Sequence, residues 1–143
     1  MKRFICTFLA LVLLPVFAVA DDFLDFFNVC AKSMYGIDDI KFASDAGIFK
    51  AYTSTYYDLQ YEPDCITLYG TKDHIVDLIA AGCCALRCFD NSGNMIDQYG
   101  RLLHAYFLAR SADDKTEKRA TTDSGILVYV LIENSLVTIR LVK

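Results

Sequence analysis

Proline, glycine and histidine are scarce in this chain, and each scarcity narrows the class of protein. The 143 residues include two prolines, seven glycines and two histidines. With so little proline and no internal repeat, we expect neither a proline-rich linker nor a repeat architecture. The glycines form no phosphate-binding loop, and neither a G-x-S-x-G nor an H-E-x-x-H motif occurs. The common signatures of nucleotide-binding proteins, serine hydrolases and zinc proteases are therefore missing.

The first twenty residues have the layout of a secretory signal peptide. Lys2 and Arg3 are basic, residues 4–17 form an apolar run, and residues 18–20 supply the small-x-small pattern that signal peptidase reads. The apolar run is shorter than the roughly 20 residues of a membrane-spanning helix, and two aspartates follow it. We therefore expect cleavage after Ala20, a secreted or periplasmic protein, and no membrane insertion after cleavage.

Acidic residues outnumber basic residues in the remaining chain, residues 21–143. Without Lys2 and Arg3, the 14 basic residues fall to 12 against 18 acidic ones, which changes the formal charge from −4 to −6. A negative charge opposes nucleic-acid phosphates and anionic lipid headgroups, so neither is expected as a partner. A chain of this length can bury a core of its own, and nothing in it marks a domain boundary.

Helical spacing of apolar residues marks three segments. From Phe23 onward the apolar residues recur at helical spacing until Gly36. In the second segment Ser44 can cap a helix, although the tyrosines and threonines that follow also favour a strand. The third segment begins at Thr71 and can close at Gly82. We predict helices over residues 21–35, 43–61 and 71–82.

Short apolar and β-branched runs predict the strands. The clearest is a hairpin near the C-terminus, whose two strands flank a three-residue connection. A helix over residues 102–110 is the main alternative to a strand there, and the polar residues 111–124 are expected to form an exposed loop. Strands are predicted over residues 65–69, 83–89, 102–110, 126–132 and 136–142.

These elements together predict an α+β fold. N-terminal helices are expected to pack on one face of an antiparallel β-meander that ends in a C-terminal hairpin. We predict one secreted domain, residues 21–143, after the signal peptide at residues 1–20.

Five cysteines remain after cleavage, and an oxidising compartment favours disulfides between them. If residues 83–89 form a strand, Cys84 and Cys88 share a face but lie too far apart to bridge one another. Cys30 on the first helix and Cys65 on a strand are then the available partners. We predict a disulfide that joins helix to sheet and leaves at least one free thiol, with buried unpaired thiols as the alternative.

Thiol chemistry is the main catalytic alternative. Cys84 or Cys88, with His74 or His104 as the base, would make a small thiol-dependent or hydrolytic enzyme. Neither histidine lies in a recognisable local motif, and the paired ligand spacing of a zinc site is missing. No catalytic residue, metal site or cofactor is therefore predicted.

Tyrosines crowd into one acidic stretch, which makes it the predicted partner-binding region. Tyrosine joins a large apolar ring to a polar hydroxyl and suits protein recognition, while the neighbouring acids favour a basic partner. The alternative is that these rings pack between helix and sheet. The predicted binding residues are Tyr52, Tyr56, Tyr57, Tyr61, Asp58 and Glu62.

The sequence as a whole predicts an exported, non-enzymatic binding protein, such as an inhibitor, an immunity factor or an accessory subunit of an envelope machine. Its size, acidity, export segment and missing catalytic motifs support this class. A self-associating structural domain is a further alternative, because the apolar strand at residues 126–132 would attract a second chain if it lay at a sheet edge.

Cleavage after Ala20 predicts that the exported protein begins at Asp21. N-terminal sequencing of protein recovered from the medium or the periplasm should read Asp-Asp-Phe-Leu. Recovery of the intact chain, beginning at Met1, from the membrane fraction would show instead that the segment is retained.

Overall fold

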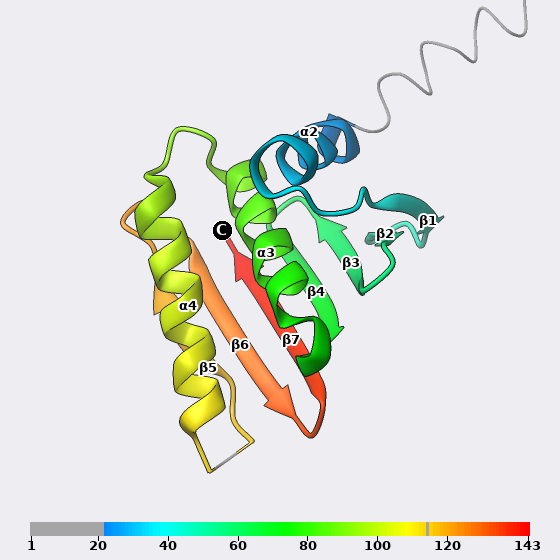
Figure 1. Cartoon of the computed structure of the whole chain (residues 1–143). Coiled ribbons are helices and arrows are strands. Elements are labelled where there is room, and N and C mark those ends of the chain that lie inside the picture. Colours follow the sequence, from blue (N-terminus) through cyan, green and yellow to red (C-terminus); the bar gives the residue numbers. More distant parts are fainter. Residues whose placement is uncertain (1–21, 114) are drawn as a thin grey trace, which may run out of the picture.

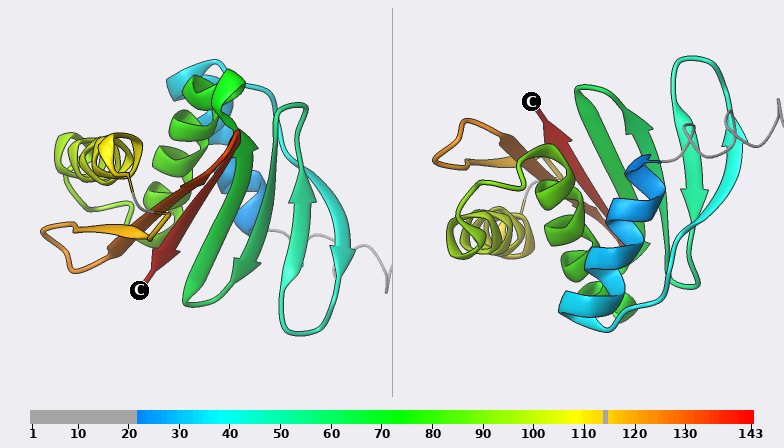
Figure 2. Two further views of the ribbon diagram at one scale, coloured as in Figure 1. Left: turned by 90° about the horizontal axis from the view of Figure 1, so that it is seen from below. Right: turned by 90° about the horizontal axis from the view of Figure 1, so that it is seen from above.

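A computed structural model describes residues 22–113 and 115–143. Within these ranges the chain forms a seven-stranded antiparallel sheet with helices on one face (Figures 1 and 2). The predicted signal peptide, residues 1–20, lies outside the described residues. None of the helices in the two described ranges is long and apolar enough to cross a membrane.

The chain begins with helical structure and then alternates between blocks of strands and helices. Helix α2 (Asp22–Cys30) continues into a π-helical turn, η1 (Ala31–Tyr35), which ends at Gly36 with a φ of 61°. Four strands follow: β1 (Lys41–Asp45), β2 (Lys50–Thr53), β3 (Tyr57–Glu62) and β4 (Cys65–Thr71). The next block is helical: η2 (Lys72–His74), α3 (Ile75–Phe89) and α4 (Met95–Ser111). The last three strands are β5 (Lys118–Thr121), β6 (Leu127–Glu133) and β7 (Leu136–Val142).

The strand order is β1-β2-β3-β4-β7-β6-β5, so β4 and β7 lie at the centre of the sheet. Their register pairs Leu68 with Ile139 and Tyr69 with Thr138. Because side chains alternate along a strand, these pairs lie on opposite faces. Leu68 and Ile139 are fully buried under the helices, whereas Tyr69 and Thr138 are half-buried on the open face.

Two glycines let α3 approach its neighbours closely. A Cβ atom at Gly70 of β4 would lie 3.1 Å from Leu78 Cδ2, and one at Gly82 of α3 would lie 2.7 Å from Leu102 Cδ2. Leu78 and Leu102 are fully buried. Helix α3 is therefore seated against the sheet through one glycine and against α4 through the other.

The predicted α+β class is confirmed, with helices on one face of an antiparallel sheet that ends in the hairpin of β6 and β7. The helix predicted over residues 43–61 is wrong. This segment forms β1, β2 and β3, because Tyr52, Tyr57 and Leu59 alternate toward the core while their neighbours point outward.

Two predicted strands are also wrong, because residues 83–89 and 102–110 belong to α3 and α4. Short apolar runs do not distinguish a buried helix from a strand. Gly82, predicted to end a helix, lies in the middle of α3, where the missing side chain makes room for Leu102. The predicted loop 111–124 contains the short strand β5.

Strand β6 is not at a sheet edge. It pairs with β5 on one side and with β7 on the other, and the two edges of the sheet are β1 and β5. The edge argument for self-association through residues 126–132 is therefore wrong.

The glycine at position 82 predicts an unusual response to alanine. Alanine normally stabilises a helix by about 1 kcal/mol relative to glycine, but at Gly82 it would overpack Leu102 at a cost of about 1–3 kcal/mol. We expect Gly82→Ala to lower the free energy of unfolding by about 1 kcal/mol in urea denaturation. Gly100→Ala in α4 is the matched control, since its Cβ would meet nothing within 4 Å. Stabilisation by both substitutions would contradict the close approach.

Candidate functional site

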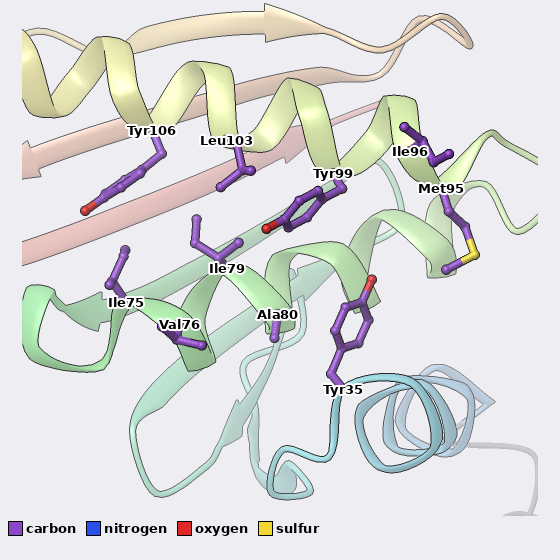
Figure 3. A pocket seen from close by; sticks show the side chains of 10 residues that line it. All are labelled: Tyr35, Ile75, Val76, Ile79, Ala80, Met95, Ile96, Tyr99, Leu103 and Tyr106. Carbon is purple, nitrogen blue, oxygen red and sulfur yellow. The ribbon is translucent and has the colours of Figure 1, made fainter.

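An apolar groove lies between α3 and α4 (Figure 3). Its volume is about 560 Å³. Side chains of the two helices face one another across it, and Tyr35 reaches toward it from η1. The wall formed by α4 repeats at helical spacing through Ile96, Tyr99, Leu103 and Tyr106. The groove thus follows about three turns of α4.

Helix α4 carries apolar residues on two faces. The first face, which includes Leu102 and Ala105, is fully buried and packs toward α3, β5 and β6. The second face lines the groove, and there Ile96 is 83% and Tyr99 46% exposed. This second face is therefore exposed toward the start of α4, whereas Tyr106 near its end is 9% exposed and joins the core.

The lining of the groove carries no formal charge. Its ten residues are Tyr35, Ile75, Val76, Ile79, Ala80, Met95, Ile96, Tyr99, Leu103 and Tyr106. Burial, and next the neighbouring Cys83 thiol, raise the pKa of Tyr35 well above its usual range, and the Tyr35 hydroxyl lies within hydrogen-bonding reach of that thiol. A lining of this kind favours uncharged apolar groups, because a charged group would lose its hydration without gaining an ionic partner.

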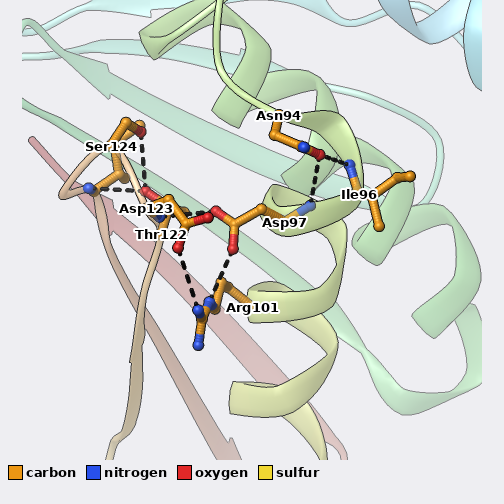
Figure 4. A network of polar contacts seen from close by, with 8 residues as sticks. Asn94, Ile96, Asp97, Arg101, Thr122, Asp123 and Ser124 are labelled. Atoms are coloured by element: carbon orange, nitrogen blue, oxygen red, sulfur yellow. Dashed lines mark hydrogen bonds and ion pairs between the residues drawn. The ribbon is translucent and has the colours of Figure 1, made fainter.

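A polar network fixes the start of α4 (Figure 4). The Asn94 side chain accepts hydrogen bonds from the backbone N–H groups of Ile96 at 2.9 Å and Asp97 at 3.1 Å. Asp97 accepts a hydrogen bond from the backbone N–H of Asp123 at 2.8 Å and pairs with Arg101 at 3.0 Å. These contacts, the Asp123 N–H first, hold the pKa of Asp97 below its usual range. These contacts hold the start of α4, and with it Ile96, against the connection between β5 and β6.

The connection between α3 and α4 is also held by side chains. Arg87 donates hydrogen bonds to the carbonyl oxygens of Gly93, at 2.6 Å, and of Asn91, and to the Gln98 side chain at 3.4 Å. Gln98, only 2% exposed, donates to the Asp90 carbonyl at 3.0 Å. Both walls of the groove are therefore fixed relative to one another before any partner arrives.

Large exposed apolar side chains concentrate on the helices. Of the thirteen such side chains among the described residues, nine belong to α2, η1, α3 and α4. They are Phe26, Val29, Met34, Val76, Met95, Ile96, Tyr99, Phe107 and Leu108. A protein partner would therefore bury more apolar surface on the helical layer than on the open face of the sheet.

The structure does not gather the predicted tyrosines into one surface. Tyr52 is 2% and Tyr57 5% exposed, so both belong to the core, and as surface anchors they are wrong predictions. Side chains along β2 and β3 point alternately to the two faces of the sheet, and the rings of Tyr52 and Tyr57 point inward. The alternative prediction, in which the tyrosines pack between helix and sheet, therefore describes these two residues. Tyr61 is partly buried and stacks on Phe23 with ring centroids 4.3 Å apart.

The other predicted binding residues are more exposed and point away from the buried rings. Tyr56, 42% exposed, stacks on His74 with ring centroids 4.0 Å apart. Asp58 accepts a hydrogen bond from the Thr53 hydroxyl at 2.7 Å, and it alternates with the inward residues of β3, as Glu62 does. Tyr56, Asp58 and Glu62 therefore do not share a surface with the buried rings of Tyr52 and Tyr57.

The cysteines of the described ranges are all unpaired. Cys65 alternates with the buried Ile66 and lies on the open face of the sheet, whereas Cys84 belongs to α3 on the helical face. The sheet therefore separates Cys65 from Cys84 and Cys88, and the disulfide between helix and sheet stays a prediction. Because the segment is a helix, Cys84 and Cys88 are one helical turn apart and not separated by four residues of extended strand.

The thiols of α3 are not placed for nucleophilic catalysis. Burial raises the pKa of Cys83 to about 11 and that of Cys88 to about 12, and it raises the pKa of Cys84 strongly as well. A nucleophilic cysteine needs the opposite shift and an imidazole beside it. Neither histidine contributes to these shifts, because His74 stacks on Tyr56 and His104 is exposed on α4. Among residues 22–113 and 115–143, no three side chains of His, Cys, Asp or Glu gather as a metal site.

The sequence interpretation missed the groove because it assigned Leu103 and Tyr106 to a strand. The signal was present in the spacing of residues 96, 99, 103 and 106, which steps by three or four as on one face of a helix. A helical interpretation of residues 102–110 would have revealed two apolar faces on the same helix.

Comparisons with models of protein families, with curated proteins and with solved structures give no significant match to this chain. Its function is therefore inferred from its own residues.

Proposed function

We propose that this chain is an exported, non-enzymatic binding protein that recognises a protein partner through the groove between α3 and α4. The observation that carries the proposal is the groove itself, an uncharged apolar cavity of about 560 Å³ with protruding apolar edges. Val76 and Ile96 at those edges are 78% and 83% exposed. Exposed apolar surface that is gathered in one place marks interaction sites in folded domains.

The extent of the apolar surface favours a protein over a small molecule. The volume of the groove falls within the range of about 300–1,000 Å³ that small ligands occupy. The apolar surface of α4 nevertheless continues beyond the groove to Phe107, which is 52% exposed and lies one helical turn after the lining residue Leu103. A ligand confined to the groove would leave this side chain in water, whereas a protein can cover the groove together with part of its surroundings.

The charge pattern suggests how such a partner is selected. The mature chain, with a formal charge of −6, attracts a partner that carries a basic surface, while the uncharged groove supplies apolar contact. Charge then mainly affects the rate of association, and the buried apolar anchors mainly affect dissociation. The signal peptide pattern at residues 1–20 supports a secreted or periplasmic setting for this encounter.

Site-specific photo-crosslinking tests the proposed surface. A photoreactive residue at Val76 or Ile96 should give a discrete adduct in the secreted or periplasmic fraction, because both positions border the groove and tolerate a new side chain. Ile48, on the connection between β1 and β2, is the matched control because it is also apolar and 77% exposed. Equal labelling from Ile48 and Ile96, or no adduct from either groove position, would contradict the proposal.

A further inference from the structure

We infer that the occupant of the α3–α4 groove is an amphipathic helix of the partner protein, with uncharged apolar side chains on the face that enters the groove. This inference rests on the proposed function and adds the class of structure that the partner presents. It depends on three properties of the groove, namely its hydrogen-bonding capacity, its length and its charge.

The groove offers almost no hydrogen-bonding partners to a peptide backbone. Three tyrosine hydroxyls, those of Tyr35, Tyr99 and Tyr106, are the only polar side-chain groups among the ten lining residues. Beyond their first turns the backbone groups of α3 and α4 are engaged within their own helices, and at the start of α4 the N–H groups of Ile96 and Asp97 are bound by the Asn94 side chain. An extended peptide would bring unpaired N–H and C=O groups into this apolar site, and a buried unpaired group is costly. A helix satisfies its own backbone and avoids that penalty.

The groove also has the length of a short helical contact. From Ile96 to Tyr106 the α4 wall covers ten residue steps, about 15 Å at the rise of an α-helix. Apolar side chains at positions i, i+3 or i+4 and i+7 of a partner helix span about 10 Å, so three anchors fit along the wall. The side chains of such a helix would pack between those of α3 and α4, as they generally do where helices meet.

The charges favour a different chain over a second copy of this one. No formal charge lines the groove, so the entering face of the helix is uncharged. Two copies that each carry a formal charge of −6 repel one another, whereas a helix with basic residues along its flanks is attracted. The partner helix is therefore apolar on one face and basic beside it.

Two synthetic peptides of identical leucine and lysine composition distinguish a helix from a strand. In one peptide the leucines follow helical spacing, and in the other they alternate with lysine, so attraction to the acidic protein is the same for both. We expect the helical peptide to bind the mature protein at least about tenfold more tightly in fluorescence anisotropy, and to shift the NMR signals of α3 and α4. Equal affinities, or tighter binding of the alternating peptide, would overturn the inference.

Uncharged variants show whether the peptide uses the groove. The double variant Val76→Ser/Ile96→Ser should weaken binding of the helical peptide by about tenfold or more, because two exposed apolar contacts are lost without a change in charge. Ile48→Ser is the matched control and should bind like the wild type. Unchanged affinity of the double variant would place the peptide elsewhere and overturn the inference.

The outcomes separate this inference from the proposed function. Crosslinking at Ile96 without any advantage for the helical peptide would leave the binding function standing and reject the helix. A doubling of mass with concentration in sedimentation experiments, abolished by Val76→Ser/Ile96→Ser, would assign the groove to a second copy and overturn the inference. Absence of crosslinking at both groove positions would remove the proposed function itself.

Discussion

The close packing of α3 determines how near the sheet and the other helices lie to one another. Nine of its fifteen residues are buried, and it contacts β4, β7, α2 and α4. Gly70 and Gly82 set how closely α3 approaches the sheet and α4. A helix covered on so many sides must be apolar around most of its circumference. In its first turn, however, Val76 is left exposed at the edge of the groove. The proposed binding surface is thus a continuation of the same apolar surface that forms the core.

The groove is formed without a partner because polar contacts hold its walls. Asn94 and Asp97 fix the start of α4, and Arg87 with Gln98 fixes the connection from α3. Surface ion pairs such as that of Asp97 and Arg101 contribute little to the free energy of unfolding. The role of this pair is to hold the start of α4 in position. A site whose walls are already ordered loses less conformational entropy on binding. In the proposed complex these polar residues would thus support affinity by keeping the groove in shape.

The sequence predicts the fold class better than it predicts the candidate site. Residues 126–142 were assigned well, because β-branched residues alternate on both sides of a short connection and the pairing is local. The helix in the middle of the chain is predicted poorly, because Cys83 to Phe89 is a short apolar run and glycine, as at position 82, commonly ends a helix. Gly82 leaves room for Leu102, twenty residues away, and a local pattern does not contain this contact. Tyr52 and Tyr57 illustrate the same limit, since their residue type suits a surface while their register turns them inward.

Side-chain footprinting with hydroxyl radicals, with and without the partner, tests the central claim most directly because it reads the exposure of individual residues. In the free protein Met95 and Tyr99 on the groove, and Phe42 and Tyr56 away from it, are all at least two-fifths exposed and should be oxidised. We expect the partner to protect Met95 and Tyr99 and to leave Phe42 and Tyr56 as reactive as before. Protection of Phe42 and Tyr56, with Met95 and Tyr99 still oxidised at the rate of the free protein, would contradict this claim.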